Sequence, residues 1–358
     1  MFLRNLLQAS ALLPFLYSTA AAETACNNSP SLCSKAYNNI THLGAHDSPY
    51  LRNEATSFST SGNQYYNTTA QLEAGVRLLS AQVHSETANG TETLRLCHTS
   101  CALLDAGTLE SWLSEIKTWM DKNTNDVVTV LIVNSDSASA ADLGAQFKSA
   151  GLDELAYTPP STTTIPTTWP TLDNLISNGT RLMTFVASLS ETSTDYPYLM
   201  DEFTFIFENA YDNVNPSNYS CTPDRPTSLT TTAAASESGR MFLMNHFLYS
   251  QSSFIESPNA TYANTTNAQS GYGSLGVSVD ECTSVYNKPP TFVLVDFFNM
   301  GPAIASVDEA NGVSDATGRT SVSAEALTSG NSSTGGVGRR QGSLLAVVVA
   351  VVVAVAFG

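Results

Sequence analysis

The sequence predicts an α/β domain whose parallel strands and covering helices close into a TIM-type (β/α)8 barrel. Short apolar runs alternate with helical stretches along most of the chain, which is the order expected when a helix follows each strand. The runs are apolar at consecutive positions, as in strands buried on both faces of a parallel sheet. Eight such runs fall within roughly 270 residues, and this length suits a closed eight-stranded barrel.

The strand pattern is clearest at residues 127–134, where β-branched side chains dominate. Such side chains are enriched in strands because they pack well on a pleated surface. In chain order, the predicted strands are 40–45, 76–84, 93–98, 127–134, 181–187, 203–207, 241–245 and 291–297.

Helical spacing is clearest at residues 109–121, where Trp112, Ile116 and Trp119 recur on one face and are expected to be core residues. The other helices are predicted at 69–74, 138–150 and 172–177, and residues 157–169 read as a loop rich in Thr and Pro.

Both ends of the chain carry targeting patterns. Arg4, an apolar stretch at 6–17 and three alanines at 20–22 predict a secretory signal peptide. An Ala/Val/Leu run at 344–357 follows a polar spacer and small residues around Asn331, which is the pattern of a glycosylphosphatidylinositol (GPI) anchor signal. Both runs are short against the roughly 20 residues of a membrane-spanning helix, which is the competing interpretation.

The expected organisation therefore has four parts. A signal peptide occupies 1–22 and the barrel 23–303, followed by a Ser/Thr/Gly-rich stalk at 304–331 and a removed GPI-anchor signal at 332–358. We expect a secreted protein, a monomer, held at the outer face of the plasma membrane or in the cell wall.

Composition agrees with an extracellular surface. The formal net charge is −17, and an acidic surface repels phosphate backbones, so a nucleic-acid partner is not expected. N-x-Ser/Thr sites are dense and predict a glycoprotein. These sites are at Asn39, Asn67, Asn89, Asn178, Asn218, Asn259, Asn264 and Asn331, with a further one at Asn27 that Pro30 weakens.

The six cysteines predict disulfides, since an even number in an oxidising compartment favours pairing. The simplest pairing joins Cys26 to Cys33, Cys97 to Cys101 and Cys221 to Cys282. A zinc site is the alternative, but the cysteine spacings match no zinc-binding pattern.

Residues able to do acid–base chemistry follow the predicted strands. His46 and Asp47 follow residues 40–45, His98 ends the run at 93–98, and Asp296 lies near the end of 291–297. Catalytic groups of a (β/α)8 barrel lie at the carboxyl ends of its strands, so these side chains are expected in one pocket. Glu208 and Asn245 end later strands and are expected to line it.

This ordered set resembles the X domain of phosphatidylinositol-specific phospholipases C. The resemblance rests on Gly44-Ala45-His46-Asp47-Ser48, then Gly75-Val76-Arg77, then a strand ending in His98, and it spans about residues 38–299. The cysteine-flanked Cys97-His98-Thr99-Ser100-Cys101 is most similar to the extracellular fungal branch. The resemblance implies a barrel phosphodiesterase that acts on a phosphoinositide, a GPI anchor or a related diester.

The resemblance also implies roles for individual residues. His46 is the general base that takes the proton of the attacking inositol hydroxyl, and His98 is the acid that protonates the leaving glycerol oxygen. Histidine suits both roles because its unperturbed pKa is about 6.5. Asp296 orients the base and stabilises its imidazolium, and Asp47 is placed to bond the nucleophilic hydroxyl.

The chain departs from the family pattern at Gln82, where other members carry a cation-binding aspartate or an arginine. Ser80 and Asn134 replace further acidic positions, so a calcium ion is not expected, and no other metal or cofactor is implied. Gln82 and Asn134 are expected to contact the substrate. His84 lies two residues beyond Gln82, on the same side of the strand, and is expected to supply positive charge near the phosphate.

Two other functions remain open. A barrel with a neutral Gln82 could bind a glycan or lipid head group without turnover, although the retained histidine pair favours an enzyme. A glycosidase would need paired carboxylates at strand ends, for which Glu208 and Asp296 are the obvious pair.

Overall fold

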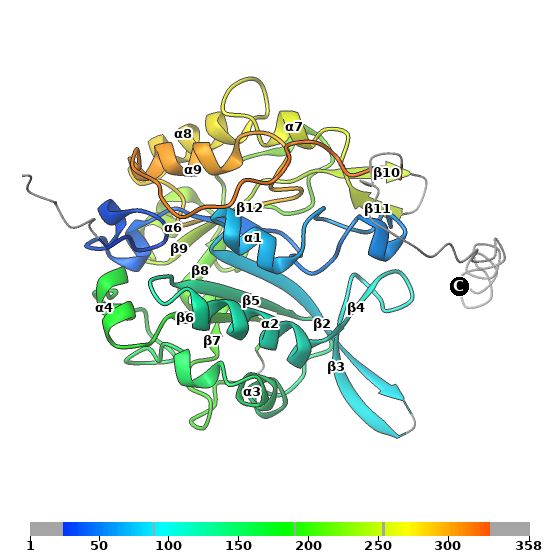
Figure 1. The fold of residues 1–358 in the computed structure, drawn as a ribbon. Helices are drawn as coiled ribbons and strands as arrows, with labels where there is room; N and C mark the ends of the chain where they lie inside the picture. The colour runs from blue at the N-terminus through cyan, green and yellow to red at the C-terminus, as the bar shows by residue number, and fades with distance from the viewer. Residues whose placement is uncertain (1–23, 89, 190, 253–254, 330–358) are drawn as a thin grey trace, which may run out of the picture.

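The fold is built on one parallel sheet that curls around the centre of the molecule (Figure 1). The computed structural model describes residues 24–329 except 89, 190 and 253–254, so the predicted signal peptide and anchor signal lie outside the described residues. The parallel strands follow the spatial order β7-β6-β5-β2-β1-β12-β9-β8. Their bounds are β1 His42–Ala45, β2 Leu78–Ala88, β5 Val128–Asn134, β6 Leu182–Ala187, β7 Met200–Asp201, β8 Ile206–Glu208, β9 Met241–Asn245 and β12 Phe292–Val295.

The sheet curls into a barrel whose two end strands are β7 and β8. Every neighbouring pair in this order is parallel, and among the described residues no ladder joins the two end strands, β7 and β8. All residues of β1, β6, β9 and β12 are buried, because side chains fill the barrel on one face and helices cover the other. The predicted α/β barrel fold is therefore confirmed, as a curled parallel sheet whose end strands are not paired in the described residues.

Helices cover the outer face of the sheet (Figure 1). Helix α2 shows why they form: Thr108 caps its N-terminus, and Trp112, Ile116 and Trp119 are buried on one side, as predicted. The helices are α1 Thr68–Ala74, α2 Leu109–Lys122, α3 Ala140–Ser149, α4 Leu172–Ser177, α5 Glu202–Phe205, α6 Thr232–Glu237, α7 Ala263–Thr266, α8 Leu275–Tyr286 and α9 Ala303–Asn311. None of the described helices is both long enough and apolar enough to cross a bilayer.

The predicted third barrel strand is not part of the barrel. Residues 91–97 form β3 (Thr91–Cys97), which pairs antiparallel with the far end of β2 and with β4 (Asp105–Thr108). The resulting hairpin projects from the barrel (Figure 1). The missing barrel position is taken by the two-residue β7, too short to give a pattern in the sequence. A second antiparallel ribbon, β10 (Tyr249–Ser252) with β11 (Ile255–Pro258), lies apart from the sheet.

The domain was predicted to end at residue 303, but it continues beyond that residue. Helix α9 begins there and buries Ala303 and Val307. Asn311 then accepts a hydrogen bond from the backbone N–H of Thr41 and donates one to its carbonyl oxygen, each at 2.8 Å. The prediction failed because small and polar side chains can be buried when the backbone bonds to the barrel, which composition does not reveal.

The segment after α9 also packs on the barrel. Arg319 pairs with Asp308, and the backbone N–H of Thr320 donates to the carbonyl oxygen of Glu73. Farther on, Leu327 packs against a cluster of Tyr65, Phe297 and Met300. Because Phe297 follows the carboxyl end of β12, the described chain leaves the barrel at the carboxyl ends of its strands.

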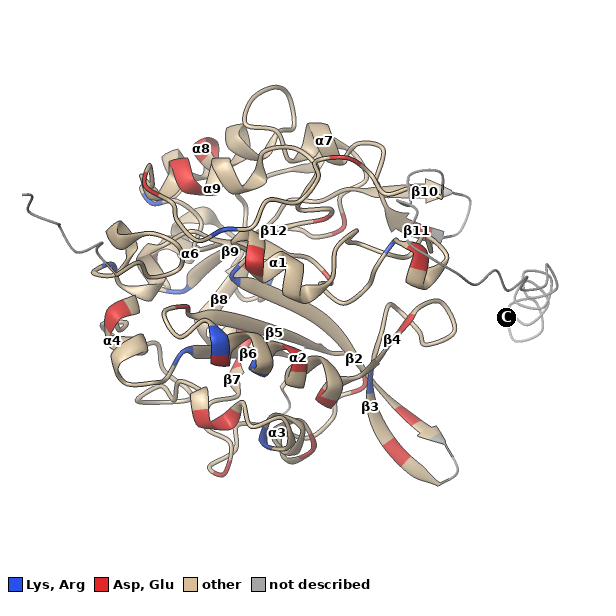
Figure 2. Cartoon of the chain, in the orientation of Figure 1, with Lys and Arg blue, Asp and Glu red and all other residues tan. Residues whose placement is uncertain are grey.

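Three disulfides are present, and their pairing is the one predicted: Cys26–Cys33, Cys97–Cys101 and Cys221–Cys282. The first ties the N-terminal segment, the second closes the loop beyond β3, and the third links the segment after β8 to α8. Acidic residues are spread over many elements of the fold, and basic residues are fewer (Figure 2).

Candidate active site

The site is organised around His46 and Asp296, which follow two adjacent strands. Ala45 of β1 is in register with Val295 of β12, so the next residues emerge side by side at the carboxyl ends of the strands. Nδ1 of His46 lies 2.9 Å from Oδ1 of Asp296, and the amide of Asn63 donates to the same oxygen at 3.0 Å. Since Nδ1–H faces the carboxylate, the lone pair of a neutral His46 is on Nε2.

The environment of His46 favours its charged form. The ring stacks on Phe247 with centroids 3.8 Å apart and planes 5° from parallel. Burial by itself lowers the pKa of His46, but the carboxylates of Asp47 and Asp296 outweigh it, so the pKa is raised above its ordinary value. In the free protein His46 is therefore protonated more readily than an exposed histidine.

Asp47 connects the two halves of the site. Its backbone has a positive φ of 48°, and its N–H donates to Oγ of Ser80 at 2.9 Å. This conformation turns the side chain inward, where it is only 1% exposed. Oδ2 lies 3.7 Å from Nε2 of His46 and 3.6 Å from Nε2 of His98, so one carboxylate oxygen faces both rings.

His98 reaches this carboxylate from the hairpin and not from a barrel strand. It follows β3, is 6% exposed, and presents its ring to the edge of Tyr50 at 5.3 Å between centroids. Burial lowers the pKa of His98 below its ordinary value, with Asp47 opposing and charged His46 reinforcing this shift. The pair thus has one ring inclined to be charged and one inclined to be neutral.

A cavity of about 250 Å³ opens beside this group. His46, Asp47 and Gln82 line one part of it. Aromatic side chains line much of the rest, and one ion pair faces them. The full lining is His46, Asp47, Ser80, Gln82, Leu131, Val133, Glu208, Tyr211, Arg225, Asn245, Phe247, Tyr249 and Leu294.

This ion pair joins Glu208 and Arg225. Nε of Arg225 donates to Oε2 of Glu208 at 3.0 Å, its Nη2 makes a second contact with the same oxygen, and the Asn245 amide donates there at 3.1 Å. The guanidinium also lies over the ring of Tyr211, 4.5 Å from its centroid. Sequence reasoning placed Glu208 and Asn245 in the pocket but missed Arg225, which lies in a segment without strand or helix pattern.

A second glutamate, Glu202, lies behind this pair and is fully buried. Burial, reinforced by the adjacent Glu208, raises its pKa well above the ordinary range, so it is held neutral. The far side of the cavity therefore carries one negative charge, on Glu208, and one positive charge, on Arg225.

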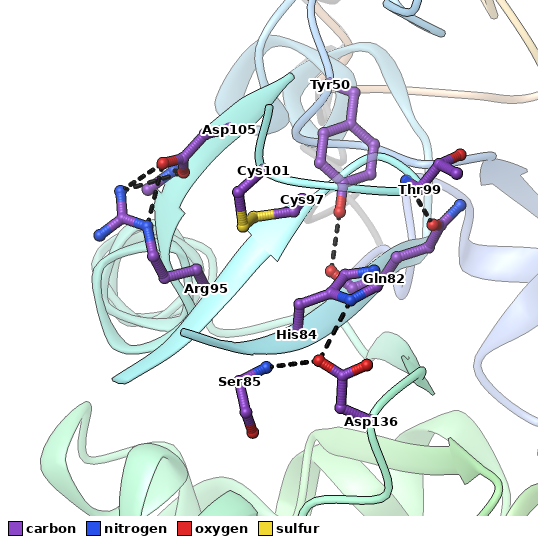
Figure 3. The surroundings of a disulfide bond; sticks show 11 residues. Tyr50, Gln82, His84, Ser85, Arg95, Cys97, Thr99, Cys101, Asp105 and Asp136 are labelled. Carbon is purple, nitrogen blue, oxygen red and sulfur yellow. Dashed lines mark hydrogen bonds and ion pairs between the residues drawn. A yellow bond between two sulfur atoms is a disulfide. The ribbon is translucent and has the colours of Figure 1, made fainter. Parts of the chain in front are cut away.

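Two residues expected to contact substrate lie elsewhere. The side chain of Asn134 bonds both backbone groups of Ala138, accepting at 2.8 Å and donating at 2.9 Å, and it does not line the cavity. Nδ1 of His84 lies 3.2 Å from Asp136, which also accepts from the backbone N–H of Ser85 (Figure 3). His84 is turned to this carboxylate because β2 continues into the hairpin beyond the barrel.

A further histidine, His42, is buried away from the site. Its Nε2 lies 3.1 Å from the carbonyl oxygen of Tyr37, and burial lowers its pKa to about 4. Within the described part of the chain, no three His, Cys, Asp or Glu side chains converge as metal ligands.

Comparison with known proteins places this geometry in a family. The sequence model of the PI-PLC X domain matches residues 32–311, which includes both histidines, Asp47 and Asp296. The chain belongs to the PI-PLC X family.

Two relatives of this chain come from Arthroderma benhamiae. A protein named PI-PLC X domain-containing protein 1 is 35% identical over 87% of this chain and 98% of its own length. An uncharacterized secreted protein is 38% identical over 79% of this chain, which spans only 62% of that relative.

Solved structures support the fold. The phosphatidylinositol-specific phospholipase C of Listeria monocytogenes superposes with a TM-score of 0.52 and 15% identity, over 78% of this chain and 94% of that one. The Staphylococcus aureus enzyme gives a TM-score of 0.52 and 12% identity over the same shares. At these identities the likeness concerns the barrel alone.

Proposed function

We propose that the protein is a phosphoric diester hydrolase of the phospholipase C type, acting on a phosphoinositide, a GPI anchor or a related diester. The observation that carries the proposal is the pair of imidazoles on one carboxylate oxygen, with His46 also held by Asp296. Membership of the PI-PLC X family and the names of the bacterial structural neighbours support this substrate class.

The chemistry is an in-line transfer within the substrate. A hydroxyl oxygen of the head group attacks phosphorus while Nε2 of His46 takes its proton. The bond from phosphorus to the glycerol oxygen breaks, and His98 supplies the proton that this oxygen needs to leave. The first products are a cyclic phosphate and a neutral lipid alcohol, so atoms and charges balance without a metal or cofactor. Water that later opens the cyclic phosphate to a phosphate monoester completes the hydrolysis. General acid–base catalysis by such a pair contributes about 10²–10⁴-fold.

The free protein has the opposite protonation order, with His46 inclined to be charged and His98 inclined to be neutral. The phosphodiester carries a negative charge, and an anion near an imidazole favours its protonated form. Substrate placed between the rings therefore raises the pKa of both, which helps to charge His98, the acid, while the productive state still requires a neutral His46.

The Glu208–Arg225–Asn245 group forms the head-group end of the proposed site. An arginine and a carboxylate together offer donors and acceptors, which is what adjacent hydroxyl groups of a polyol require. Tyr211, Tyr249 and Phe247 add apolar faces against which a ring can pack.

We also propose that the protein works outside the cell, as a glycosylated, GPI-anchored monomer that needs no metal. The N-terminal signal, the sequons and the anchor signal support this, as do three disulfides and a secreted relative. The neutral Gln82, Ser80 and Asn134 support metal independence, because calcium takes several charged oxygen ligands.

A second candidate is a binding protein that holds a glycan or lipid head group without turnover. The observation that favours it is the lack of a cation at Gln82, because loss of an electrostatic stabiliser costs about 10²–10³-fold in rate.

One experiment separates the two functions. The purified full chain is assayed on phosphatidylinositol vesicles with and without EDTA, and the product is identified by phosphorus NMR. Cleavage to a cyclic phosphate that resists EDTA and is lost in His46→Ala supports the enzyme. The matched control is His84→Gln, a histidine outside the cavity, which should keep full activity. Head-group binding without any product in the wild type would favour the binding protein.

A further inference from the structure

Gln82 is bonded to three parts of the site at once. Its Nε2 donates to Oδ2 of Asp47 at 2.9 Å, and its Oε1 accepts from the backbone N–H of Thr99 at 2.9 Å. Its own carbonyl oxygen accepts from the hydroxyl of Tyr50 at 2.7 Å, and the Tyr50 ring makes a T-shaped contact with His98. Figure 3 shows Tyr50 and Thr99 meeting Gln82 from two sides.

The loop that carries His98 is held closed by covalent and backbone bonds. Cys97 and Cys101 form a disulfide around His98, Thr99 and Ser100. Within this loop the N–H of His98 donates to the carbonyl oxygen of Leu104 at 2.9 Å, and Thr99 adopts a positive φ of 62°. A non-glycine residue keeps such a conformation only where its surroundings hold it.

We propose that Gln82 and the Cys97–Cys101 disulfide form a clamp that positions His98 against Asp47, and that Gln82 is a positioning residue and not a ligand of the substrate phosphate. The proposal rests on the proposed function for its kinetic test, but it makes structural predictions that need no turnover.

The chemistry of the amide explains why glutamine occupies this position. A primary amide donates to one neighbour while its oxygen accepts from another. A guanidinium can donate to Asp47 but cannot accept from the N–H of Thr99. A carboxylate can accept from that N–H but repels Asp47. Only an amide of this length satisfies both, so the neutral residue at position 82 is suited to holding the loop.

The two hydrogen bonds of the Gln82 amide, to Asp47 and to Thr99, can be removed separately. Gln82→Arg keeps a donor for Asp47 and loses the acceptor for Thr99, whereas Gln82→Glu does the reverse. Gln82→Met keeps the length and loses both. Because a displacement of about 1 Å at a catalytic group costs about 10²-fold, we expect kcat to fall about 10²-fold in all three variants with KM within twofold. A residue that binds phosphate would behave differently, since Gln82→Arg would then raise activity.

Amide hydrogen exchange at Thr99 tests the clamp without substrate. The exchange rate should rise at least tenfold in Gln82→Arg and Gln82→Met, which lack the acceptor, and stay near the wild-type rate in Gln82→Glu. Unchanged protection of Thr99 in all three variants would overturn the proposal.

The disulfide is tested with a matched pair. In Cys97→Ser/Cys101→Ser the loop opens, and the pKa of His98, followed by NMR, should rise toward 6.5 as the ring becomes hydrated. The charges facing that ring, on Asp47, Asp296 and His46, remain in the variant. The Cys26→Ser/Cys33→Ser protein lacks a disulfide outside the site, and its His98 pKa and kcat should match the wild type.

The outcomes distinguish the clamp from the proposed function. A wild type that releases no product from phosphatidylinositol overturns the proposed function, and the exchange and NMR results still decide the clamp. A wild type that turns over, with Gln82→Arg faster and Thr99 still protected, overturns the clamp alone.

Discussion

Oδ2 of Asp47 lies 3.6 Å from Nε2 of His98 while the same oxygen faces His46 at 3.7 Å. The negative charge of Asp47 shifts the pKa of each histidine upward, although burial keeps the pKa of His98 below its ordinary value. Removing this charge therefore lowers the pKa of both. We expect Asp47→Asn to move the pH optimum of kcat/KM to lower pH and to reduce its maximum about 10²-fold. Rates measured between pH 5 and 8 check this. Asp136→Asn, which removes a carboxylate beside His84 and outside the cavity, should leave the optimum in place.

The pH profile of the wild type follows from the two shifts. In the proposed mechanism His46 is the base and must be neutral, and because its pKa is raised, the neutral form accumulates only above about pH 6.5. His98 is the proposed acid and must be protonated. Because its pKa is lowered below 6.5, the protonated form is already lost as pH rises through that lowered pKa. We expect a bell-shaped kcat/KM with a low maximum, because the productive protonation state is a minor one. A rate that rises steadily with pH would contradict these roles.

Asp296 is expected to act through His46. Asp296→Asn removes a charge that raises the pKa of His46, so that pKa should fall in an NMR titration, and the asparagine can hold the wrong tautomer. We expect kcat to fall about 10²-fold or more, with KM nearly unchanged. A variant with normal kcat would show that the carboxylate serves only the fold.

The head-group end should affect binding more than rate. Arg225→Met removes a charged donor, and hydrogen bonds to charged groups contribute about 1.5–3 kcal/mol, so KM should rise about tenfold or more with kcat little changed. Glu208 is 2% exposed and would lose its partner, which destabilises the fold. The double variant Glu208→Gln/Arg225→Met removes both charges, and thermal melts of the single and double variants separate stability from binding.

Two buried histidines predict acid sensitivity of the fold. Burial lowers the pKa of His42 and of His246 to about 4, below the ordinary 6.5. A lowered folded-state pKa gives full stability above pH 6.5 and loses it as pH falls toward 4. The free energy of unfolding should drop by about 2 kcal/mol for each histidine at pH 5. Urea unfolding at pH 7 and pH 5 measures this, and His42→Gln should show a shallower dependence on pH.

The sequence was sufficient to predict the barrel and the disulfide pairing, because buried parallel strands and paired cysteines leave strong patterns. It could not show that the run ending in His98 leaves the barrel. An apolar run reads alike in a parallel and an antiparallel ladder, and the choice depends on partners distant in the chain. The two-residue β7 was missed for a related reason. It is too short to show a strand pattern in the sequence, and its pairing with β6 makes it a strand.

The candidate site was partly predictable. His46 and Asp296 follow adjacent strands, so their strand positions alone placed them together. Arg225 was missed because it lies in an irregular segment, where the ion pair with Glu208 and the Tyr211 ring fix its position. Asn134 was misplaced because its side chain satisfies the backbone of the following turn, a local demand that strand alternation does not show.

The route of the chain after α9 bears on where the proposed activity would meet its substrate. Leu327 packs against the cluster that contains Phe297, and Phe297 directly follows Asp296, so the last described residues lie on the side of the barrel that holds the cavity. With the proposed GPI anchor attached beyond residue 329, the mouth of the cavity would be within a short reach of the membrane that holds the anchor. For the proposed activity, the effective concentration of lipid head groups would then be set by the length of the anchored segment, so we expect shortening or lengthening that segment to change the rate without altering a catalytic group.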